Sequence, residues 1–361
     1  MVTTSVAAGP AELAAALRRA GVREIDTATR RRAEYSSDAS NYRVVPAVVA
    51  FPRHADEIAA ALDVCRRLGV PLVPRGGGTS IAGNALSTGL VLDLSRHLNR
   101  VVEIDPQART AVAEPGTVLD SITAAAAPYG LRFGPDPSTH SRATIGGAIG
   151  NNACGSRALR YGRTADNVVA LDVITGAGTR MVARRYGRDG AAGAPGPEPG
   201  RQPGPQPGRL PGLQPGTEAG LVSALGDLID GRLATVRTEF GRFARQVSGY
   251  SLEHLLPENG TDLAKFLAGT EGTLALTLQA TVRLVAAPKA TALAVLGYAD
   301  MAAAAEAAPG LLPHLPVALE GLDSRFVEVV RSRRGRGCRA AAAGCSPRRR
   351  ATPRPRRATP R

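Results

Sequence analysis

The chain lacks the residues and runs that several classes of protein require. It has no tryptophan, three methionines and four cysteines in 361 residues, and only 4% of its residues are aromatic. No apolar run approaches the roughly 18 residues that span a bilayer, and residues 1–9 lack the basic and apolar regions of a secretory signal. We therefore expect a cytoplasmic protein without a transmembrane segment.

The few cysteines and histidines are too scattered to bind a metal ion. Cys65, Cys154, Cys338 and Cys345 form no C-x-x-C pair, and no histidine and cysteine cluster has the spacing of a zinc or iron–sulfur site. We therefore predict no metal site. Cys65 falls on the apolar face of an expected helix, which favours an ordinary buried thiol.

Acidic residues are absent from residues 331–361, which hold twelve arginines. The formal net charge of the chain is +14, so this tail leaves +2 for the other 330 residues. Phosphate contacts by basic residues are typical of nucleic-acid binding. Here the charge is confined to a tail without interleaved aromatic residues, so we expect no nucleic-acid partner.

Two segments depart from the pattern of a globular chain. Residues 187–216 hold nine glycines and eight prolines, which predicts a disordered surface insertion; a polyproline docking site is the alternative. The apolar periodicity stops after residue 330, inside an expected helix. A frame-shifted end explains that break, and a genuine disordered basic tail is the alternative.

The remaining sequence alternates between helical and strand-like periodicity. The pattern predicts helices over residues 11–20, 55–68 and 117–128, the last with Thr117 as its N-cap, and a polar connection over residues 27–43. Strands are predicted over residues 44–51, 70–73, 90–94, 101–104, 110–113, 168–174, 273–285 and 291–298. The first strand, helix and second strand indicate a βαβ crossover. The excess of strands beyond it favours an α+β fold.

A glycine-rich stretch, PRGGGTSIAGN at residues 74–84, directly follows a predicted strand. Three adjacent glycines permit positive φ and let consecutive N–H groups converge on an anion. The stretch fails the Walker A pattern, because Asn84 and Ala85 replace its Lys and Ser/Thr, and the Rossmann fingerprint, because Ile81 stands where glycine is needed. We interpret it as a phosphate loop of another kind; a flexible turn is the alternative.

Two further stretches are dense in glycine, hydroxyl and amide groups. GPDPS at residues 134–138 and TIGGAIGNNACG at residues 144–155 are too apolar for a solvated linker. We expect their backbone to approach a flat ligand; a structural glycine-rich crossing is the alternative. GTEGT at residues 269–273 adds a weaker signal before a strand.

These motifs, in this order and with AEPG at residues 113–116 and RYG at residues 160–162, resemble FAD-linked oxidases of the vanillyl-alcohol oxidase type. The similarity is to the branch of D-lactate, glycolate and D-2-hydroxyglutarate dehydrogenases. It implies an FAD-binding PCMH-type domain of two subdomains at residues 42–288, after an N-terminal helical segment at residues 1–41. Residues 289–330 would begin a ferredoxin-like cap domain.

The resemblance also implies how FAD would be held. The glycine loop would bind the pyrophosphate, residues 135–138 would lie along the flavin, and residues 168–173 would pass the adenine. Thr79 stands where relatives with covalent flavin often have histidine, so noncovalent FAD is expected. The implied cofactor-binding residues are Pro74, Arg75, Gly76, Gly77, Gly78, Thr79, Ser80, Gly83, Asn84, Pro135, Asp136, Ser138, Thr144, Gly146, Gly147, Asn151, Asn152, Gly155, Val168, Val173, Glu271 and Gly272.

Enzymes of this kind transfer a hydride from a 2-hydroxy acid to flavin N5 and pass electrons to a further acceptor, unidentified here. Their substrate arginines, histidine base and metal-binding histidine pair typically come from the cap. The five histidines of this chain do not form that pair, so its catalytic residues stay unassigned. We expect a weakly active chain truncated within its cap and without an iron–sulfur domain. A flavin-binding remnant or subunit without independent catalysis is the alternative.

Overall fold

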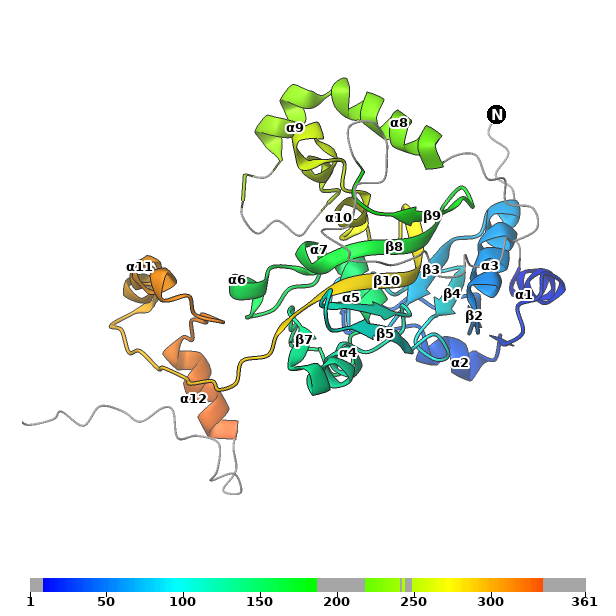
Figure 1. The fold of residues 1–361 in the computed structure, drawn as a ribbon. Helices are drawn as coiled ribbons and strands as arrows, with labels where there is room; N and C mark the ends of the chain where they lie inside the picture. The colour runs from blue at the N-terminus through cyan, green and yellow to red at the C-terminus, as the bar shows by residue number, and fades with distance from the viewer. Residues whose placement is uncertain (1–8, 187–217, 241, 244–248, 334–361) are drawn as a thin grey trace, which may run out of the picture. The chain divides into compact units, whose positions relative to one another are not determined.

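The computed structural model describes residues 9–186, 218–240, 242–243 and 249–333 (Figure 1). The chain divides into two compact units, Met1–Ala287 and Pro288–Arg361. The predicted insertion at residues 187–216 and the tail from residue 334 lie outside the described residues.

The smaller sheet of the first unit has the strand order β1-β2-β4-β3. Its strands are β1 (Ile25–Asp26), β2 (Val48–Ala50), β3 (Leu72–Arg75) and β4 (Leu90–Asp93). The last three run parallel, and β1 is antiparallel to β2. The predicted β2–α3–β3 crossover is present, but β4 lies between its two strands.

Two amphipathic helices pack beside this sheet. They are α1 (Pro10–Arg19) and α3 (Ala55–Leu68), which contact one another. α3 has the predicted bounds, and Gly69 ends it in the left-handed conformation at φ +62°. Cys65 lies on its buried face, and burial raises the pKa of this thiol to about 12. The prediction of an ordinary buried thiol is confirmed.

The larger sheet is antiparallel and is built around one long strand. Its order is β5-β6-β10-β8-β9, and β7 also pairs with β10. β10 alternates buried and half-buried residues, as expected for a strand covered on one face. The strands are β5 (Val101–Asp105), β6 (Thr110–Ala113), β7 (Leu131–Phe133), β8 (Val168–Thr175), β9 (Arg180–Ala183) and β10 (Ala275–Ala286).

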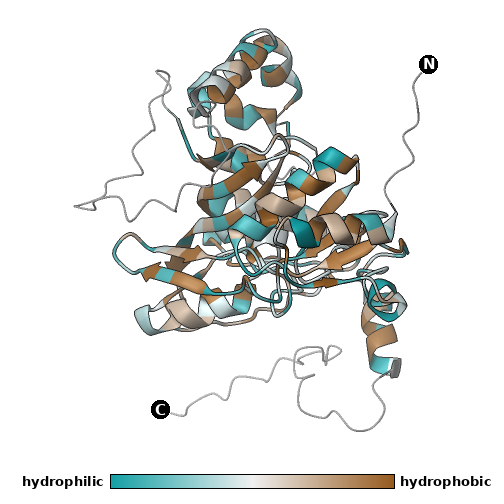
Figure 2. Cartoon of the chain, turned by 90° about the vertical axis from the view of Figure 1, so that its right-hand side faces the viewer, coloured by the Kyte–Doolittle hydropathy of each residue, from teal (hydrophilic) through white to brown (hydrophobic). Residues whose placement is uncertain are grey.

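Short helices surround the larger sheet. In Figure 1, α8 and α9 lie beyond β9, and α4 lies beside β7. The strands in the centre of the body are mostly coloured as hydrophobic in Figure 2. The helices of this part are α4 (Leu119–Ala126), α5 (Ile145–Asn151), α6 (Ala158–Tyr161), α7 (Thr164–Asn167), α8 (Glu218–Asp230), α9 (Leu233–Glu239) and α10 (Leu263–Leu267), with single 3-10 turns at Ala127–Tyr129, Leu252–Leu255 and Pro257–Asn259. The remaining helix, α2 (Thr29–Glu34), contacts β2 of the smaller sheet.

The larger sheet contributes residues to the core of the smaller sheet. Ile174 from β8 and Leu276 from β10 are buried in the core of the smaller sheet, together with Leu17 and Ile58. The two subdomains are therefore joined by apolar packing, and the mixed helix and sheet architecture confirms the predicted α+β class.

Three local predictions were wrong. The helix after residue 117 begins at Leu119 and is capped by Val118; the hydroxyl of Thr117 instead donates to the carbonyl of Arg100 at 2.9 Å. The polar connection contains the helix α2. Residues 291–298 are not a strand, because no described strand of that unit is present to pair with them.

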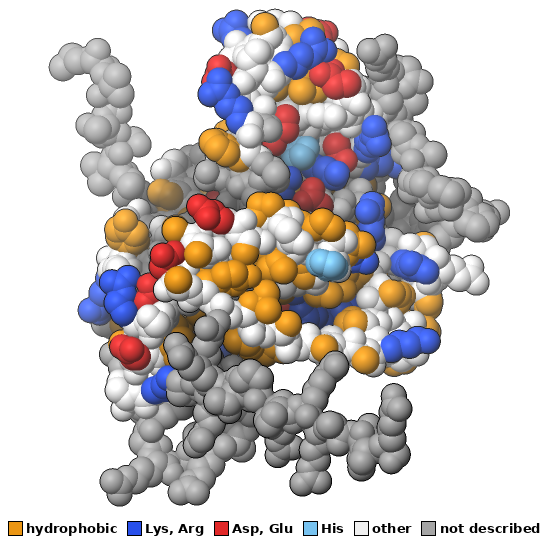
Figure 3. All heavy atoms as spheres, turned by 90° about the vertical axis from the view of Figure 1, so that its left-hand side faces the viewer, with side chains coloured by type: hydrophobic (Ala, Val, Ile, Leu, Met, Phe, Trp, Pro, Cys, Tyr) orange, Lys and Arg blue, Asp and Glu red, His pale blue; other side chains and the backbone are white. Residues whose placement is uncertain are grey.

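The second unit, described from residue 288 to residue 333, consists of α11 (Met301–Leu311), a 3-10 turn at Leu312–His314 and α12 (Ser324–Arg333). α12 confirms a helix around residue 330 and extends three residues into the expected tail. Many apolar side chains here are exposed: Leu293 is 86% and Phe326 is 60% exposed. On the face of the molecule that Figure 3 draws, hydrophobic side chains lie among charged ones. Its assignment as the start of a ferredoxin-like cap stays a prediction.

Candidate cofactor site

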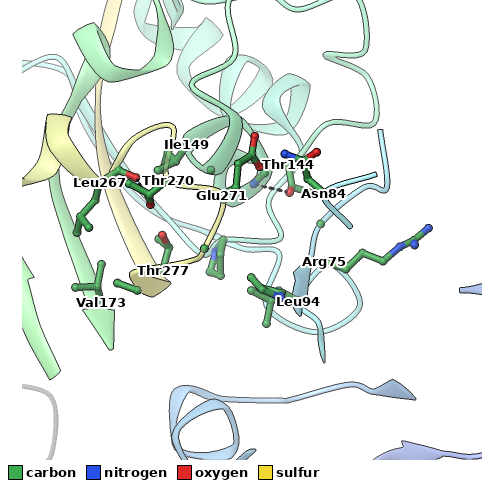
Figure 4. A pocket seen from close by; sticks show the side chains of 18 residues that line it. Arg75, Asn84, Leu94, Thr144, Ile149, Val173, Leu267, Thr270, Glu271 and Thr277 are labelled. Carbon is green, nitrogen blue, oxygen red and sulfur yellow. Dashed lines mark hydrogen bonds between the residues drawn. The ribbon is translucent and has the colours of Figure 1, made fainter. Parts of the chain in front are cut away.

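Two adjoining hollows lie within the first unit, where β3 ends and the large sheet begins. Figure 4 shows the first of them. Each hollow covers about 660 Å³ of space between the side chains, part of it open to solvent. They share a rim made of Pro74, Gly76, Asn84, Thr144, Gly147 and Glu271. Segments distant in the sequence therefore meet at one site.

The glycine loop lines the second hollow with backbone donors. The five successive N–H groups of residues 76–80 donate no hydrogen bond within the described part of the chain. Only one of the three glycines, Gly78, has positive φ, at +62°. Free N–H groups that follow one another around a turn make a concave anion site, so this loop can hold a diphosphate.

The other two glycines of the triplet are needed for close packing. A Cβ atom at Gly76 would overlap the hydroxyl of Thr144, and one at Gly77 would overlap the carbonyl of Arg142. Residues 76–77 therefore press against residues 142–144. The sequence reading assigned all three glycines to ligand approach, whereas the structure gives two of them a contact with the opposite wall.

The side chain of Arg75 points away from the hollow (Figure 4). Its guanidinium donates to the carbonyl of Ser37 at 3.0 Å and lies 5.0 Å from the ring centre of Tyr35. Burial and a hydrogen bond to Asp93 raise the pKa of Tyr35, so its phenol stays protonated. Arg75 thus fixes the N-terminal segment behind the glycine loop rather than offering its charge to a phosphate.

The helix α5 forms the wall between the hollows. Thr144 is 1% exposed and caps α5 by accepting from the N–H of Gly147 at 3.3 Å. The N–H of Gly146 donates to the carbonyl of Pro115 at 2.8 Å. Both glycine N–H groups are thus used inside the protein, so these residues shape the wall rather than supply donors.

The loop after α10 closes the site in an unusual conformation. Glu271 has φ +54° and Gly272 has φ +73°, and the left-handed conformation costs a non-glycine residue roughly 1–2 kcal/mol. The N–H of Glu271 donates to the carbonyl of Gly150 at 3.0 Å, and its carboxylate accepts from Nδ2 of Asn151 at 2.8 Å. Both bonds fasten the loop to the end of α5.

Fifteen of the residues named from the sequence line one or both hollows. They are Pro74, Arg75, Gly76, Gly77, Gly78, Thr79, Ser80, Asn84, Thr144, Gly146, Gly147, Asn151, Val173, Glu271 and Gly272. Their convergence from four separate segments (residues 74–84, 144–151, 173 and 271–272) places the predicted phosphate loop and the later motifs together.

The other seven, Gly83, Pro135, Asp136, Ser138, Asn152, Gly155 and Val168, do not line the hollows. Asn152 is 1% exposed, and its side-chain oxygen accepts from the N–H of Ala165. A Cβ atom at Gly155 would overlap the carbonyl of Asp136, whose carboxylate pairs with Arg157 at 2.7 Å. Asn152, Gly155 and Asp136 therefore make contacts within the protein instead of lining the hollows.

The sequence reading missed the apolar part of the lining. The first hollow is also lined by Leu94, Pro115, Ile149, Leu267, Thr270, Ala275 and Thr277, and the second by Pro137 and Thr139. Pro115 belongs to the AEPG motif and Thr270 to the GTEG motif, so two signals were available. The leucines and isoleucine look like any core residue in the sequence.

Histidine is absent from the lining of both hollows. Four histidines of the first unit lie beside acidic side chains: His54 near Glu57, His97 near Glu24, His140 near Asp120 and His254 near Glu253. Burial lowers the pKa of His254. Within the described ranges, no three His, Cys, Asp or Glu side chains are grouped to hold a metal ion.

Comparison with known proteins shows what these hollows belong to. The profile of one protein family, described as FAD binding domain, matches residues 46–184. Residues 46–184 are an FAD-binding domain. The expectation that FAD is the cofactor is thereby confirmed, as is the resemblance to FAD-linked oxidases.

Relatives of this FAD-binding chain are considerably longer. It is 32% identical over 331 residues to D-2-hydroxyglutarate dehydrogenase of Pseudomonas putida, covering 90% of this chain and 31% of the relative. It is 31% identical over 315 residues to glycolate oxidase subunit GlcD of Bacillus subtilis, covering 86% of this chain and 53% of the relative. The chain thus spans about a third and about half of these two lengths.

A solved structure shares the fold. Alkyldihydroxyacetonephosphate synthase is superimposable with a TM-score of 0.50 over 77% of this chain and 42% of its own, at 16% sequence identity. This similarity supports the two-subdomain architecture of the FAD-binding domain. No helix of the described residues is long and apolar enough to cross a membrane.

The residues of the site fit FAD. FAD joins two flat ring systems through a diphosphate, and the free N–H groups of residues 76–80 suit that diphosphate. The adjoining hollow has apolar walls from Leu94, Ile149 and Val173, which suit a flat ring. The N–H donors for a diphosphate therefore lie next to apolar walls for a flat ring, as the two neighbouring parts of a dinucleotide require.

Proposed function

We propose that this chain is an FAD-dependent oxidoreductase that acts on the CH–OH group of a 2-hydroxy acid. The observation that carries the proposal is the row of five free N–H groups beside an apolar hollow, in a domain of the FAD-binding family. Similarity to D-2-hydroxyglutarate dehydrogenases and to a glycolate oxidase subunit supports a hydroxy acid as the substrate class.

The protein would contribute binding and orientation. Bound FAD supplies a two-electron acceptor that takes a hydride from the α-carbon of the acid. Residues 76–80 would hold the diphosphate, and Asn84, Thr144 and the loop at Glu271 would enclose the cofactor where the two hollows meet. The apolar wall from Val173 and Leu267 would pack against the adenine ring of FAD.

The described site offers little to a substrate. Oxidation of an alcohol needs a base for the hydroxyl proton, and the acid needs a cation for its carboxylate. Neither hollow is lined by histidine or lysine, and the guanidinium of Arg75 is already bound by backbone carbonyls. We therefore propose that the chain binds FAD well and oxidises hydroxy acids slowly.

The test is anaerobic mixing of the FAD-loaded protein with D-2-hydroxyglutarate, glycolate or D-lactate while the visible flavin absorbance is followed. L-2-Hydroxyglutarate and protein-free FAD are the controls. We expect slow bleaching by one or more of the three acids. Bleaching by none of them would contradict the oxidoreductase proposal and favour a flavin-binding subunit without its own catalysis. Rapid bleaching would show that these hollows contain a base overlooked here.

A further inference from the structure

Glu271 is the acidic residue of the site, and its position needs an explanation. Of the side chains that line the two hollows, that of Glu271 alone is acidic, and it borders both hollows. A carboxylate beside a diphosphate loop repels the ligand. The residue therefore opposes binding unless it meets a different part of the cofactor.

The carboxylate is held in place rather than free to turn away. Glu271 has φ +54° and is tied by its N–H to the carbonyl of Gly150 at 3.0 Å. Oε1 accepts from Nδ2 of Asn151 at 2.8 Å. Oε2 accepts no hydrogen bond from any residue that the structure describes. One acceptor oxygen is thus presented at the border of the hollows.

The two sides of this border differ in chemistry. On one side lie the free N–H groups and hydroxyls of residues 77–80, and on the other lie Leu94, Val173 and Leu267. In the adenosine half of FAD, the group between the diphosphate and the flat adenine is a ribose. Ribose carries two hydroxyl donors, which are what an unoccupied carboxylate oxygen can accept.

We propose that the carboxylate of Glu271 accepts a hydrogen bond from a ribose hydroxyl of the adenosine half of FAD, and that Asn151 positions it. The proposal rests on the cofactor site described above. It explains why a negative charge stands at the border, because a hydroxyl bound to an ionised acceptor is a strong partner. It also makes Glu271 a specificity-determining residue, since a phosphate on that ribose would meet its charge.

The test measures affinity for FAD and for FAD analogues whose adenosine ribose lacks the 2′- or the 3′-hydroxyl. We expect the wild-type protein to bind one deoxy analogue about tenfold more weakly than FAD, in line with a hydrogen bond to a charged group. In Glu271→Ala this gap should vanish, because the acceptor is gone. Glu12→Ala, on the exposed side of α1, is the matched control and should keep the gap.

Glu271→Gln provides a second test in case the alanine variant does not fold, because glutamine keeps the shape of the side chain and one acceptor oxygen. Its gap should be smaller than in the wild type, and FAD with a phosphorylated adenosine ribose should bind it more tightly than it binds the wild type. The proposal is overturned if neither deoxy analogue binds more weakly than FAD, or if the gap is unchanged in both Glu271 variants. Failure to bind FAD at all would instead overturn the cofactor site, and absent hydroxy-acid oxidation would leave this measurement unaffected.

Discussion

The backbone of Gly76 lies against the hydroxyl group of Thr144, so closely that a Cβ atom at residue 76 would overlap Oγ1. The same hydroxyl accepts from the N–H of Gly147 and caps α5. One buried side chain therefore sets the distance between the glycine loop and the helix that faces it. The width of the cofactor site depends on this contact.

Gly76→Ala should lower the free energy of unfolding by about 2 kcal/mol, because the added methyl group overpacks the contact. Thr144→Ala should cost about 1 kcal/mol through loss of the cap. It also removes the overlapping oxygen, so the double variant should be more stable than the two single effects predict. Urea unfolding followed by circular dichroism measures all four proteins.

Gly226→Ala is the control for this cycle. Gly226 lies in α8 with no atom near its added Cβ, so alanine there should be neutral or stabilising. Strict additivity of Gly76→Ala and Thr144→Ala would show that the two residues do not interact in solution.

Gly78→Asp should weaken FAD binding through its charge. Gly78 has φ +62°, a conformation that Asp and Asn both tolerate better than most residues. The added Cβ would lie 2.5 Å from Nη2 of Arg75, so both variants must displace this guanidinium to the same extent. Gly78→Asn introduces a side chain of the same shape without the charge. The difference between the two variants therefore measures the repulsion between the carboxylate and the diphosphate.

We expect the dissociation constant for FAD to be at least about tenfold higher for Gly78→Asp than for Gly78→Asn, as measured by titration with FAD. Thermal unfolding of the apo-proteins checks that both variants fold. Equal dissociation constants would place the diphosphate away from this loop.

FAD should be bound without a covalent bond. Thr79 lines the second hollow at the loop position where relatives with covalent flavin often carry histidine, and a hydroxyl does not form such a link. Precipitation of the FAD-loaded protein with acid should release all flavin into the supernatant. A pellet that stays yellow after washing would contradict this prediction.

Local chemistry made much of the fold predictable. α3 has the apolar spacing of one helical face and a glycine where its left-handed cap falls, so its bounds were predicted without error. β10 alternates buried apolar residues with less buried residues that are mostly polar, which is the pattern of a strand with one covered face. The glycine triplet indicated a phosphate loop because its composition limits what the backbone can do there.

Contacts between residues that are far apart in the chain explain why the roles of some residues and some local structure could not be predicted. The contact between Gly76 and Thr144 joins two loops that are far apart in the chain, so no local pattern reveals which glycine faces a ligand. α5 contains three glycines and forms through its cap and its packing. Thr117 was predicted to be an N-cap, but its hydroxyl donates a hydrogen bond to the backbone carbonyl of Arg100. Residues 291–298 have a strand-like sequence, but a strand also needs a neighbouring strand to pair with, and the described part of that unit has none.

The last prediction concerns acid stability and the turn before β8. The carboxylate of Asp166 accepts from the backbone N–H of Arg163 at 2.9 Å and from its Nε at 3.1 Å. Burial alone would raise the pKa of Asp166, but these bonds and the charge of Arg163 outweigh it and hold the pKa below the ordinary value of 3.8. The ionised carboxylate therefore closes the first turn of α7.

Asp166→Asn should lower the free energy of unfolding at pH 7 by about 1 kcal/mol, a typical value for a partly exposed ion pair. The unfolded chain takes up this proton at a higher pH than the folded chain does, so the contribution of the carboxylate is complete above about pH 4 and is lost as the pH falls through its depressed pKa. The difference in unfolding free energy between the wild-type protein and Asp166→Asn should consequently be constant from about pH 5 to about pH 8, where the carboxylate is ionised in both the folded and the unfolded chain. It should shrink in more acidic buffer. Urea unfolding at each pH gives the two free energies. Asp63→Asn, which breaks an exposed pair with Arg67, is the control and should change stability by less than about 0.5 kcal/mol. A difference that stays the same in acid would mean that the charge of Asp166 does not stabilise the turn, and that its hydrogen bonds to Arg163 are replaced equally well by an amide.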